Sequence, residues 1–441
     1  MEKKDIISTM PNEIISNILS RLTIKEAGRT SILSTRWRYQ WTYFFGVVNF
    51  DHSLKNYNLR RQNKLNPLRK SIVFVSEWKK FMSDLEHVLK SLKCPTMQGL
   101  RICMELGNPQ KVAQWVKFAA EKNVQVLELN FFYNFTTTFF EISEKIRNVI
   151  SSTSFEMKSL CVLRLSAVDV TGEVIEHFLA TCPSLETLCV IESKSFILRL
   201  KVSGQALKLK HLELVEVKII HLDISAENLM TFRYSGGFGR FNFESVPNLV
   251  EASFGGRYSS YLQPNMNNVD LFGLISQLNV LKLDLFPHDK GILEGLPEFT
   301  NVKHLELQIP HTCGGKMDRA LSLLSAFPSI CVLKVKFLRC NMKPEEEEEW
   351  EANLKGEFPN LKELGVSGYR RDTSQIELLI SIVENAPNLN KIVVDPLSSY
   401  YVDISPDDVR AWIRKRRHGS AKWYADGLKQ YVPPQIEVIV L

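Results

Sequence analysis

Hydrophobic positions near the start of the chain recur at helical spacing and predict a short amphipathic helix. It should begin near Pro11, since proline fits the first turn of a helix. Thr23 and Glu26 form a capping-box pair that predicts a second helix, and Ser34 is a candidate N-cap for a third. A module as short as residues 10–41 buries little surface, so part of its apolar stripe should pack on another protein or on the rest of the chain. The stripe consists of Ile14, Ile15, Ile18, Leu19 and Leu22.

From Met97 onward a second pattern, L-x-x-L-x-L, returns at intervals of 20 to 36 residues. Leucine-rich repeats are typically about 20–29 residues long, so most intervals fit and a few carry insertions. The last two apolar positions flank one outward residue on a short strand, so both point into the core. The apolar face of a single repeat is exposed to solvent unless the neighbouring repeats cover it. This predicts an α/β solenoid with a parallel sheet. Equivalent core positions should be Leu163, Leu188, Leu212, Leu281, Leu305 and Leu333.

Helices and turns are expected between these strands, at irregular lengths. Residues 174–180 and 376–384 have helical patterns, and a proline before several strands, as in FPNLKEL at Phe358, ends the helix and favours an extended entry. Repeats over residues 229–271 are rich in glycine and aromatic residues and are expected to lack helices. The final residues, 407–441, predict one helical segment and a last strand that caps the array.

The segment that joins the first module to the repeats has three parts. Residues 43–50 alternate between apolar and polar side chains and predict a strand. Residues 56–70 are polar and basic without periodicity, which predicts a solvated, mobile loop. Residues 72–92 have apolar positions at helical spacing and predict an amphipathic helix.

One outward residue per repeat should stand beside its counterparts on an open wall of the sheet. The charges along this wall alternate in sign, which suits a protein or peptide partner better than a nucleic acid. The alternative is that many are merely solvated strand residues. The charged candidates for substrate contact are Arg101, Glu128, Arg164, Glu213, Arg233, Lys282, Glu306 and Lys334, and the uncharged positions are Cys189, Ser253, Gly365 and Val393.

Composition narrows the function classes. The 441 residues are 44% hydrophobic and 24% charged, as in ordinary folded proteins, and the net charge of +6 is scattered. The eight cysteines include no C-x-x-C pair, which fits a reducing compartment, and no segment has a signal-peptide core or the length to span a membrane. We therefore expect the protein to be located in the cytoplasm, the nucleus or both. The basic run at residues 414–417 is expected to form the C-terminal turn of a helix, and the alternative is that it is a nuclear import signal.

No residue pattern predicts catalysis. The glycine-rich residues 236–239 lack the Lys-Ser/Thr of a phosphate-binding loop and are expected to form a turn. The histidines lack metal-ligand spacing. We expect no catalytic residue, no cofactor and no metal, which leaves binding surfaces as the carriers of function.

The first module carries a family resemblance. Its ending, LSTRWRYQW at residues 33–41, resembles the LS-x-RW-x-x-W ending of plant F-box domains, and Met10-Pro11 stands at the family's leucine-proline. Residues 358–396 resemble the FBD domain of plant F-box proteins through Gly368-Tyr369 and the turn at residues 385–389. The implied domains are an F-box (1–50), a connector with an amphipathic helix (51–95), leucine-rich repeats (96–357) and FBD-like final repeats with a cap (358–441).

The resemblance implies a non-catalytic substrate-recognition subunit of a Skp–cullin–F-box ubiquitin ligase. Its F-box would dock on a Skp-type adaptor, and through it on cullin and RING subunits, while the repeats would hold an unidentified protein substrate. Two alternatives remain open: a Skp-binding or repeat scaffold outside any ligase, and a receptor gated by a small molecule. The adaptor-binding residues would be Met10, Pro11, Ile14, Ile15, Ile18, Leu19, Leu22, Ala27, Leu33 and Trp37.

Overall fold

The computed structural model of the chain has two compact units, Met1–His211 and Leu212–Leu441. The residues that the structure describes are 10–53, 67–105, 110–132, 157–204, 207–258, 269–285, 296–310, 323–338, 357–369, 373–395, 419, 423 and 426–441. The acidic run at 345–349, the basic run at 414–417, Cys313 and Cys340 lie outside these residues.

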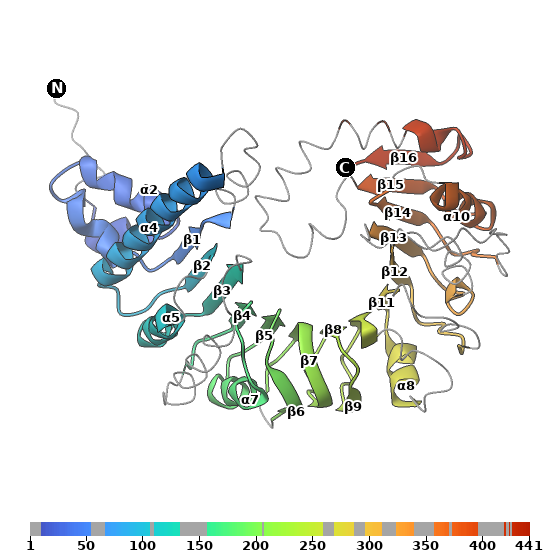
Figure 1. Ribbon diagram of the computed structural model, residues 1–441, viewed down its shortest axis with the longest axis horizontal. Coiled ribbons are helices and arrows are strands. Elements are labelled where there is room, and N and C mark those ends of the chain that lie inside the picture. The colour runs from blue at the N-terminus through green and yellow to red at the C-terminus, as the bar shows by residue number, and fades with distance from the viewer. Residues whose placement is uncertain are drawn as a thin grey trace. The chain divides into compact units, whose positions relative to one another are not determined.

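The first unit combines a small helical module with a parallel sheet. The module holds α1 (Asn12–Leu19), α2 (Ile24–Arg29) and the 3₁₀ helices η2 (Thr30–Ile32) and η3 (Trp37–Tyr43). The sheet has the order β1-β2-β3-β4-β5. Its strands are β1 (Val47–Asp51), β2 (Gly99–Glu105), β3 (Val126–Phe132), β4 (Val162–Ser166) and β5 (Thr187–Ile191), and β6 (Phe196–Ser203) packs on α7. Its longer helices are α4 (Pro67–Ser91), α5 (Gln110–Glu121) and α7 (Gly172–Thr181) (Figure 1).

The capping box predicted at the second helix is confirmed. The Thr23 side chain accepts a hydrogen bond from the Glu26 N–H at 3.2 Å, and the Thr23 N–H donates to Glu26 Oε2 at 2.9 Å. The Thr23 N–H, together with the Thr23 hydroxyl, which donates to the same Oε2 at 2.8 Å, holds the pKa of the Glu26 carboxyl below its usual value. The third helix is a 3₁₀ helix that begins at Trp37, whose N–H lies 3.4 Å from the Ser34 hydroxyl. Ser34 therefore supports this turn without being its N-cap, because Arg36 occupies that position.

The helical module is continuous with the sheet. The strand predicted at residues 43–50 is present only from Val47, as β1, because Tyr43 still belongs to η3. β1 forms the first strand of the sheet and pairs with β2 from Val47↔Gly99 onward. The Phe45 N–H donates to Ser20 Oγ at 2.9 Å, and the Gln98 N–H donates to the Phe45 carbonyl at 2.7 Å. A domain boundary at residue 50 would therefore cut through β1.

The connector helix starts earlier than the sequence predicts. α4 begins at Pro67, so residues 67–70 of the predicted loop are helical, and residues 54–66 lie outside the described residues. Proline is well placed at the first turn of a helix, which explains this start. None of the described helices is long and apolar enough to cross a lipid bilayer.

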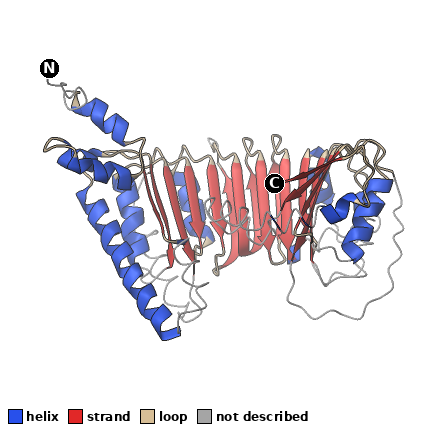
Figure 2. Cartoon of the chain, turned by 90° about the horizontal axis from the view of Figure 1, so that it is seen from above, coloured by secondary structure: helices blue, strands red, loops and turns tan. Residues whose placement is uncertain are grey.

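The second unit continues the repeat pattern. Its sheet has the order β7-β8-β10-β11-β12-β13-β14-β15-β16, and its strands run side by side (Figure 2). They are β7 (His211–Ser225), β8 (Thr231–Gly236), β10 (Glu251–Gly256), β11 (Val280–Asp284), β12 (His304–Pro310), β13 (Val332–Leu338), β14 (Glu363–Ser367), β15 (Lys391–Asp395) and β16 (Glu437–Val440). The helices α8 (Val269–Gln277) and α10 (Thr373–Glu384) lie on one side of this sheet (Figure 1).

The helix-poor region predicted at residues 229–271 is confirmed for residues 229–256, which form strands and turns, but α8 begins at Val269, so residues 269–271 are helical. There, β9 (Arg240–Ser245) pairs in parallel with the second half of β7 and takes the place of a helix. Its aromatic side chains join an aromatic core. The ring of Phe241 meets the ring of Tyr234 edge-on, with 4.6 Å between the ring centroids, and stacks on the ring of Tyr258, with 4.3 Å between the centroids. The glycine-rich residues form the turn before β9, and a Cβ on Gly236 would lie 2.5 Å from the Val217 carbonyl.

The predicted repeat phase is confirmed by burial and by strand register. The predicted core leucines are all 0–1% exposed. The predicted outward positions align strand by strand, as Arg101↔Glu128↔Arg164↔Cys189 in the first unit, but Cys189 is 2% exposed and Ser253 is 9% exposed, so these two predicted outward residues are buried. In the second unit the row is Arg233↔Ser253↔Lys282↔Glu306↔Lys334↔Gly365↔Val393↔Ile439.

A pair of neighbouring substitutions tests this phase. Leu281→Ala should lower the free energy of unfolding by about 2–5 kcal/mol, because it opens a cavity in the core. Lys282→Ala should cost about 0–1 kcal/mol, because it removes one partly exposed ion pair. Urea denaturation followed by circular dichroism measures both. Equal losses would show that the assigned phase is wrong.

Candidate interaction surfaces of the helical module and the sheet wall

Burial divides the apolar residues of the helical module into two groups. Ile15 and Leu19 on α1 are fully buried, whereas Ile14 and Ile18 on the same helix are 46% and 41% exposed. Leu22, just after α1, is also exposed. The spacing of these three exposed residues places them on one face of the helix, beside the buried face.

The predicted adaptor-binding set is therefore a mixture. Ile15, Leu19, Ala27 and Trp37 are buried and form the core of the module. Of the others, Pro11, Ile14, Ile18, Leu22 and Leu33 are exposed, and Met10 is partly exposed. A direct contact with a partner suits only this second group, and its role in binding stays a prediction.

The side chain of Asn12 explains how α1 is held against η3. Asn12 Oδ1 accepts hydrogen bonds from Arg36 Nη2 at 3.0 Å and from Gln40 Nε2 at 3.2 Å. The Arg36 guanidinium also donates to the Met10 carbonyl. These contacts orient α1 so that Ile15 faces inward.

The predicted set leaves out three exposed residues of the module, Ile32, Tyr39 and Tyr43, of which Ile32 is the most exposed. Ile32, at the end of η2, is 88% exposed and precedes the exposed Leu33. Single exposed apolar residues are ordinary, but several in one small module indicate an interaction surface. A helical count does not find Ile32, because it lies in a 3₁₀ turn outside the α1 stripe. The adjacent apolar residues Ile32 and Leu33 in this turn are the sequence feature that could have predicted it.

The wall residues are joined by ion pairs across neighbouring strands. In the first unit, Glu128 lies between two arginines, with Oε2 3.0 Å from Arg101 Nε and Oε1 3.7 Å from Arg164 Nε. These three side chains come from β2, β3 and β4 at one register position. One carboxylate therefore orients two guanidinium groups.

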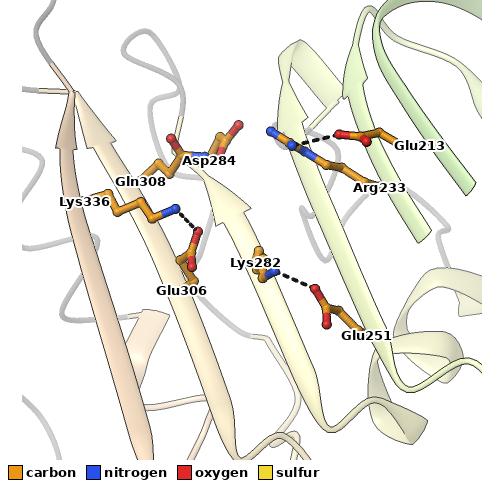
Figure 3. Close-up of polar contacts among 8 residues, drawn as sticks. All are labelled: Glu213, Arg233, Glu251, Lys282, Asp284, Glu306, Gln308 and Lys336. Carbon is orange, nitrogen blue, oxygen red and sulfur yellow. Dashed lines mark hydrogen bonds and ion pairs between the residues drawn. The ribbon is translucent and has the colours of Figure 1, made fainter. Parts of the chain in front are cut away.

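The second unit repeats this arrangement (Figure 3). Arg233 Nη1 lies 2.9 Å from Glu213 Oε1, and Gln308 Nε2 donates to Asp284 Oδ1. The lysine–glutamate pairs on the wall are Lys282–Glu251 at 2.5 Å, Lys336–Glu306 at 2.5 Å and Lys391–Glu363 at 3.0 Å. In each of these contacts the donor lies on the strand that follows the strand of the acceptor.

Seven of the eight predicted substrate-contact residues are members of these ion pairs. Lys334 is the exception: it is exposed, and no described residue forms an ion pair with it. The sequence reasoning missed partners such as Glu251 and Lys336, which lie two residues from a central position on their strands. The period of two puts such residues on the same face, so the pattern could have found them. Substrate contact by the eight residues stays a prediction.

The buried ionisable groups offer little nucleophilic chemistry. No disulfide joins the cysteines that the structure describes, and burial raises the pKa of Cys94, Cys103 and Cys182. A thiol with a raised pKa is a poor nucleophile. Burial likewise raises the pKa of the Tyr234 hydroxyl to about 12. These groups behave as part of the core.

Comparison with known families identifies the chain. The model of the F-box domain matches residues 7–44, which contain all four short helices of the module. The model of the At1g61320/AtMIF1 LRR domain matches residues 86–418, most of the chain. The chain belongs to the F-box/LRR-repeat proteins. Members of this family are typically substrate receptors of ubiquitin ligases, and F-box domains generally bind Skp-type adaptors.

Similar proteins in Arabidopsis thaliana support this membership. F-box/FBD/LRR-repeat protein At1g13570 is 24% identical over 89% of this chain and 91% of its own length. F-box/FBD/LRR-repeat protein At5g56420 is 23% identical over 89% and 92%. F-box/LRR-repeat protein At2g42730 is 24% identical over 66% and 67%. The FBD in two of these names agrees with the FBD resemblance at residues 358–396.

Two adjacent residues of α1 separate folding from surface effects in this F-box/LRR-repeat protein. Leu19→Ala should destabilise the chain by about 2–5 kcal/mol, because Leu19 is fully buried. Ile18→Ala should change stability by less than about 1 kcal/mol, because its side chain is already partly in water. Thermal unfolding measured on both variants checks the burial. A larger loss from Ile18→Ala would contradict the orientation of α1.

Proposed function

We propose that this chain is the substrate-recognition subunit of a Skp–cullin–F-box ubiquitin ligase, active in the cytoplasm, the nucleus or both. Its F-box docks on a Skp-type adaptor, and its sheet wall holds the protein to be ubiquitinated. The chain itself is non-catalytic: it positions the substrate, while the bound ligase subunits transfer ubiquitin. The single observation that carries the proposal is the exposed apolar face of α1, with Ile14, Ile18 and Leu22, inside a matched F-box.

The size of this face is sufficient for a central contact. Fully burying one isoleucine or leucine side chain is worth roughly 1.5–3 kcal/mol. Binding energy concentrates in a few apolar or aromatic anchors surrounded by near-neutral contacts. The exposed aliphatic residues of the module supply such anchors, and covering them adds the burial that the module lacks alone; they are Ile14, Ile18, Leu22, Ile32 and Leu33.

The attachment of the F-box to the first repeats supports a positioning role. α4 packs against the start of the sheet through Phe81, whose ring meets Phe50 of β1 edge-on at 5.7 Å. Trp78 Nε1 donates to the Glu105 carbonyl of β2 at 3.0 Å, and Lys111 Nζ of α5 lies 2.6 Å from Glu86 Oε1. These contacts hold α4 on the first strands of the sheet, and the Lys93 N–H, just after α4, donates to the Thr42 carbonyl of η3 at 2.7 Å. A substrate held on the wall of the first unit would therefore keep a defined place relative to the adaptor, which raises its effective concentration near the ligase.

Docking on the adaptor is tested by substitutions on the exposed face. Ile14→Ala combined with Ile18→Ala should weaken adaptor binding at least tenfold, which is about 1.4 kcal/mol. Val75→Ala on α4 is the matched control, since Val75 is an exposed aliphatic residue outside the F-box. Calorimetric titration of purified adaptor measures both. Unchanged affinity in the double variant would refute the docking face.

A truncation separates the two activities. Removing residues 1–43 deletes the four short helices and keeps β1, the first strand of the sheet. This variant should lose the adaptor and keep the substrate, whose half-life in cells should lengthen because it is held without a route to ubiquitin. Co-immunoprecipitation and a degradation chase measure both effects. A substrate that is still degraded rapidly would favour a scaffold outside any ligase, and binding that requires an added small molecule would favour a gated receptor.

A further inference from the structure

The wall of the second unit changes character between β13 and β14. Up to β13, the central row carries paired charges at Lys282 and Glu306. From β14 onward the same row reads Gly365↔Val393↔Ile439, without a charge. All three positions are partly exposed, so they form a strip of open apolar surface. We call Gly365, Val393 and Ile439 the apolar lane.

Lys334 stands at the head of this lane. It pairs in register with Gly365, and a Cβ added to Gly365 would lie 3.0 Å from Lys334 Cγ. The stem of Lys334 therefore runs beside the glycine, where no side chain separates it from the lane. The long aliphatic stem of a lysine can cover apolar surface while its ammonium group stays in water.

The charges on the neighbouring strands leave the ammonium group of Lys334 in excess. On one side, Lys336 on the same strand is neutralised by Glu306 of β12. On the other side, Glu363 of β14 is engaged by Lys391 of β15. No described residue forms an ion pair with Lys334 itself, so its charge faces solvent at the head of the lane.

The far end of the lane has the opposite sign. Asp395 of β15 lies in register with Ser367 of β14, and Glu437 of β16 lies in register with Lys391. Asp395 is already engaged in an interaction of its own, so the negative charge at this end of the row comes from Glu437, which is exposed and lies two residues before Ile439 on β16. The lane consequently has a positive head and a negative tail, which gives it a direction.

We propose that the apolar lane and Lys334 bind an extended peptide segment of the substrate, with an acidic residue, then aliphatic residues, then a basic residue. This inference rests on the proposed function and specifies the class of sequence that the wall recognises. The acidic side chain would pair with Lys334, the aliphatic side chains would cover Val393 and Ile439, and the basic side chain would face Glu437.

The dimensions of the lane suit such a segment. Three strand spacings separate Lys334 from Ile439, which is about 14 Å, or four to five residues of extended chain. A nucleic acid fits this surface poorly, because its uniform negative charge would meet Glu437 at the tail. Because the two ends of the apolar lane carry opposite charges, the lane should select the order of the charged residues in the peptide as well as its composition.

Selection from a displayed library of random heptapeptides, on the purified full chain, tests the proposal. Enriched peptides should share the order acidic, aliphatic, basic, read in one chain direction. One enriched peptide and its twin with the acidic and basic residues exchanged should then be compared by fluorescence polarisation. The exchanged twin should bind at least about fivefold more weakly, since two exposed charge pairs become repulsive.

Two variants address the lane and one serves as control. Lys334→Glu should weaken the enriched peptide about fivefold by reversing the charge at the head. Gly365→Val should weaken it similarly by filling the lane, and circular dichroism confirms that both variants are folded. Lys362→Glu makes the same change of charge at an exposed lysine immediately before β14, outside the row, and should leave the affinity unchanged.

The outcomes separate this inference from the proposed function. Adaptor binding is measured on the same proteins and should be equal for wild type and Lys334→Glu. If wild type binds the adaptor but no ordered motif is enriched, or if Lys334→Glu keeps full peptide affinity, the lane proposal is wrong and the adaptor proposal stands. If wild type fails to bind the adaptor while the motif is enriched, the ligase role is wrong and the lane proposal stands.

Discussion

The structure depends on the burial of alternate leucines between parallel strands held in register. A single repeat cannot bury its own apolar face, so each strand requires the one before and the one after. Because side chains alternate along a strand, a slip of one residue would turn Leu281 outward and Lys282 inward. The cost of that exchange fixes the register, and the register in turn fixes which residues stand on the wall. Stability and recognition therefore use the same alternation on opposite faces of one strand.

The F-box is attached by the same kind of interaction. β1 extends the sheet by one strand, and its backbone hydrogen bonds continue the ladder into the helical module. Ser20 and Phe45 lie at the junction, where a side-chain hydroxyl accepts the N–H just before the strand. A Cβ on Gly46 would collide with the Ser20 carbonyl, so the chain can approach α1 this closely only with glycine there. The F-box is thus joined directly to the first strand of the sheet.

The sequence predicts features that depend on local periodicity and misses those that depend on packing between elements. Thr23 and Glu26 specify a capping box because the contact spans three residues. The repeat phase is likewise readable, since Leu163 and Arg164 differ in polarity. The inner and outer members of the α1 stripe are not separable in this way, because Arg36 and Asn12 decide the rotation of the helix from opposite ends of the module. The replacement of a helix by β9 also depends on long-range pairing with β7, which local patterns do not contain.

The ion pairs on the wall explain why most of its charges are weak candidates for recognition and one is a strong candidate. Each exposed pair contributes little to stability, about 0–1 kcal/mol, yet it holds two side chains in place and cancels their charges. A partner that recruited Lys282 or Lys336 would have to separate it from a glutamate that already binds it. Lys334 carries no such cost within the described residues, and the interruption of paired charges at Gly365 leaves apolar surface beside it. On a wall of mutually satisfied charges, the specificity that we propose would therefore be concentrated at the position where the pairing stops.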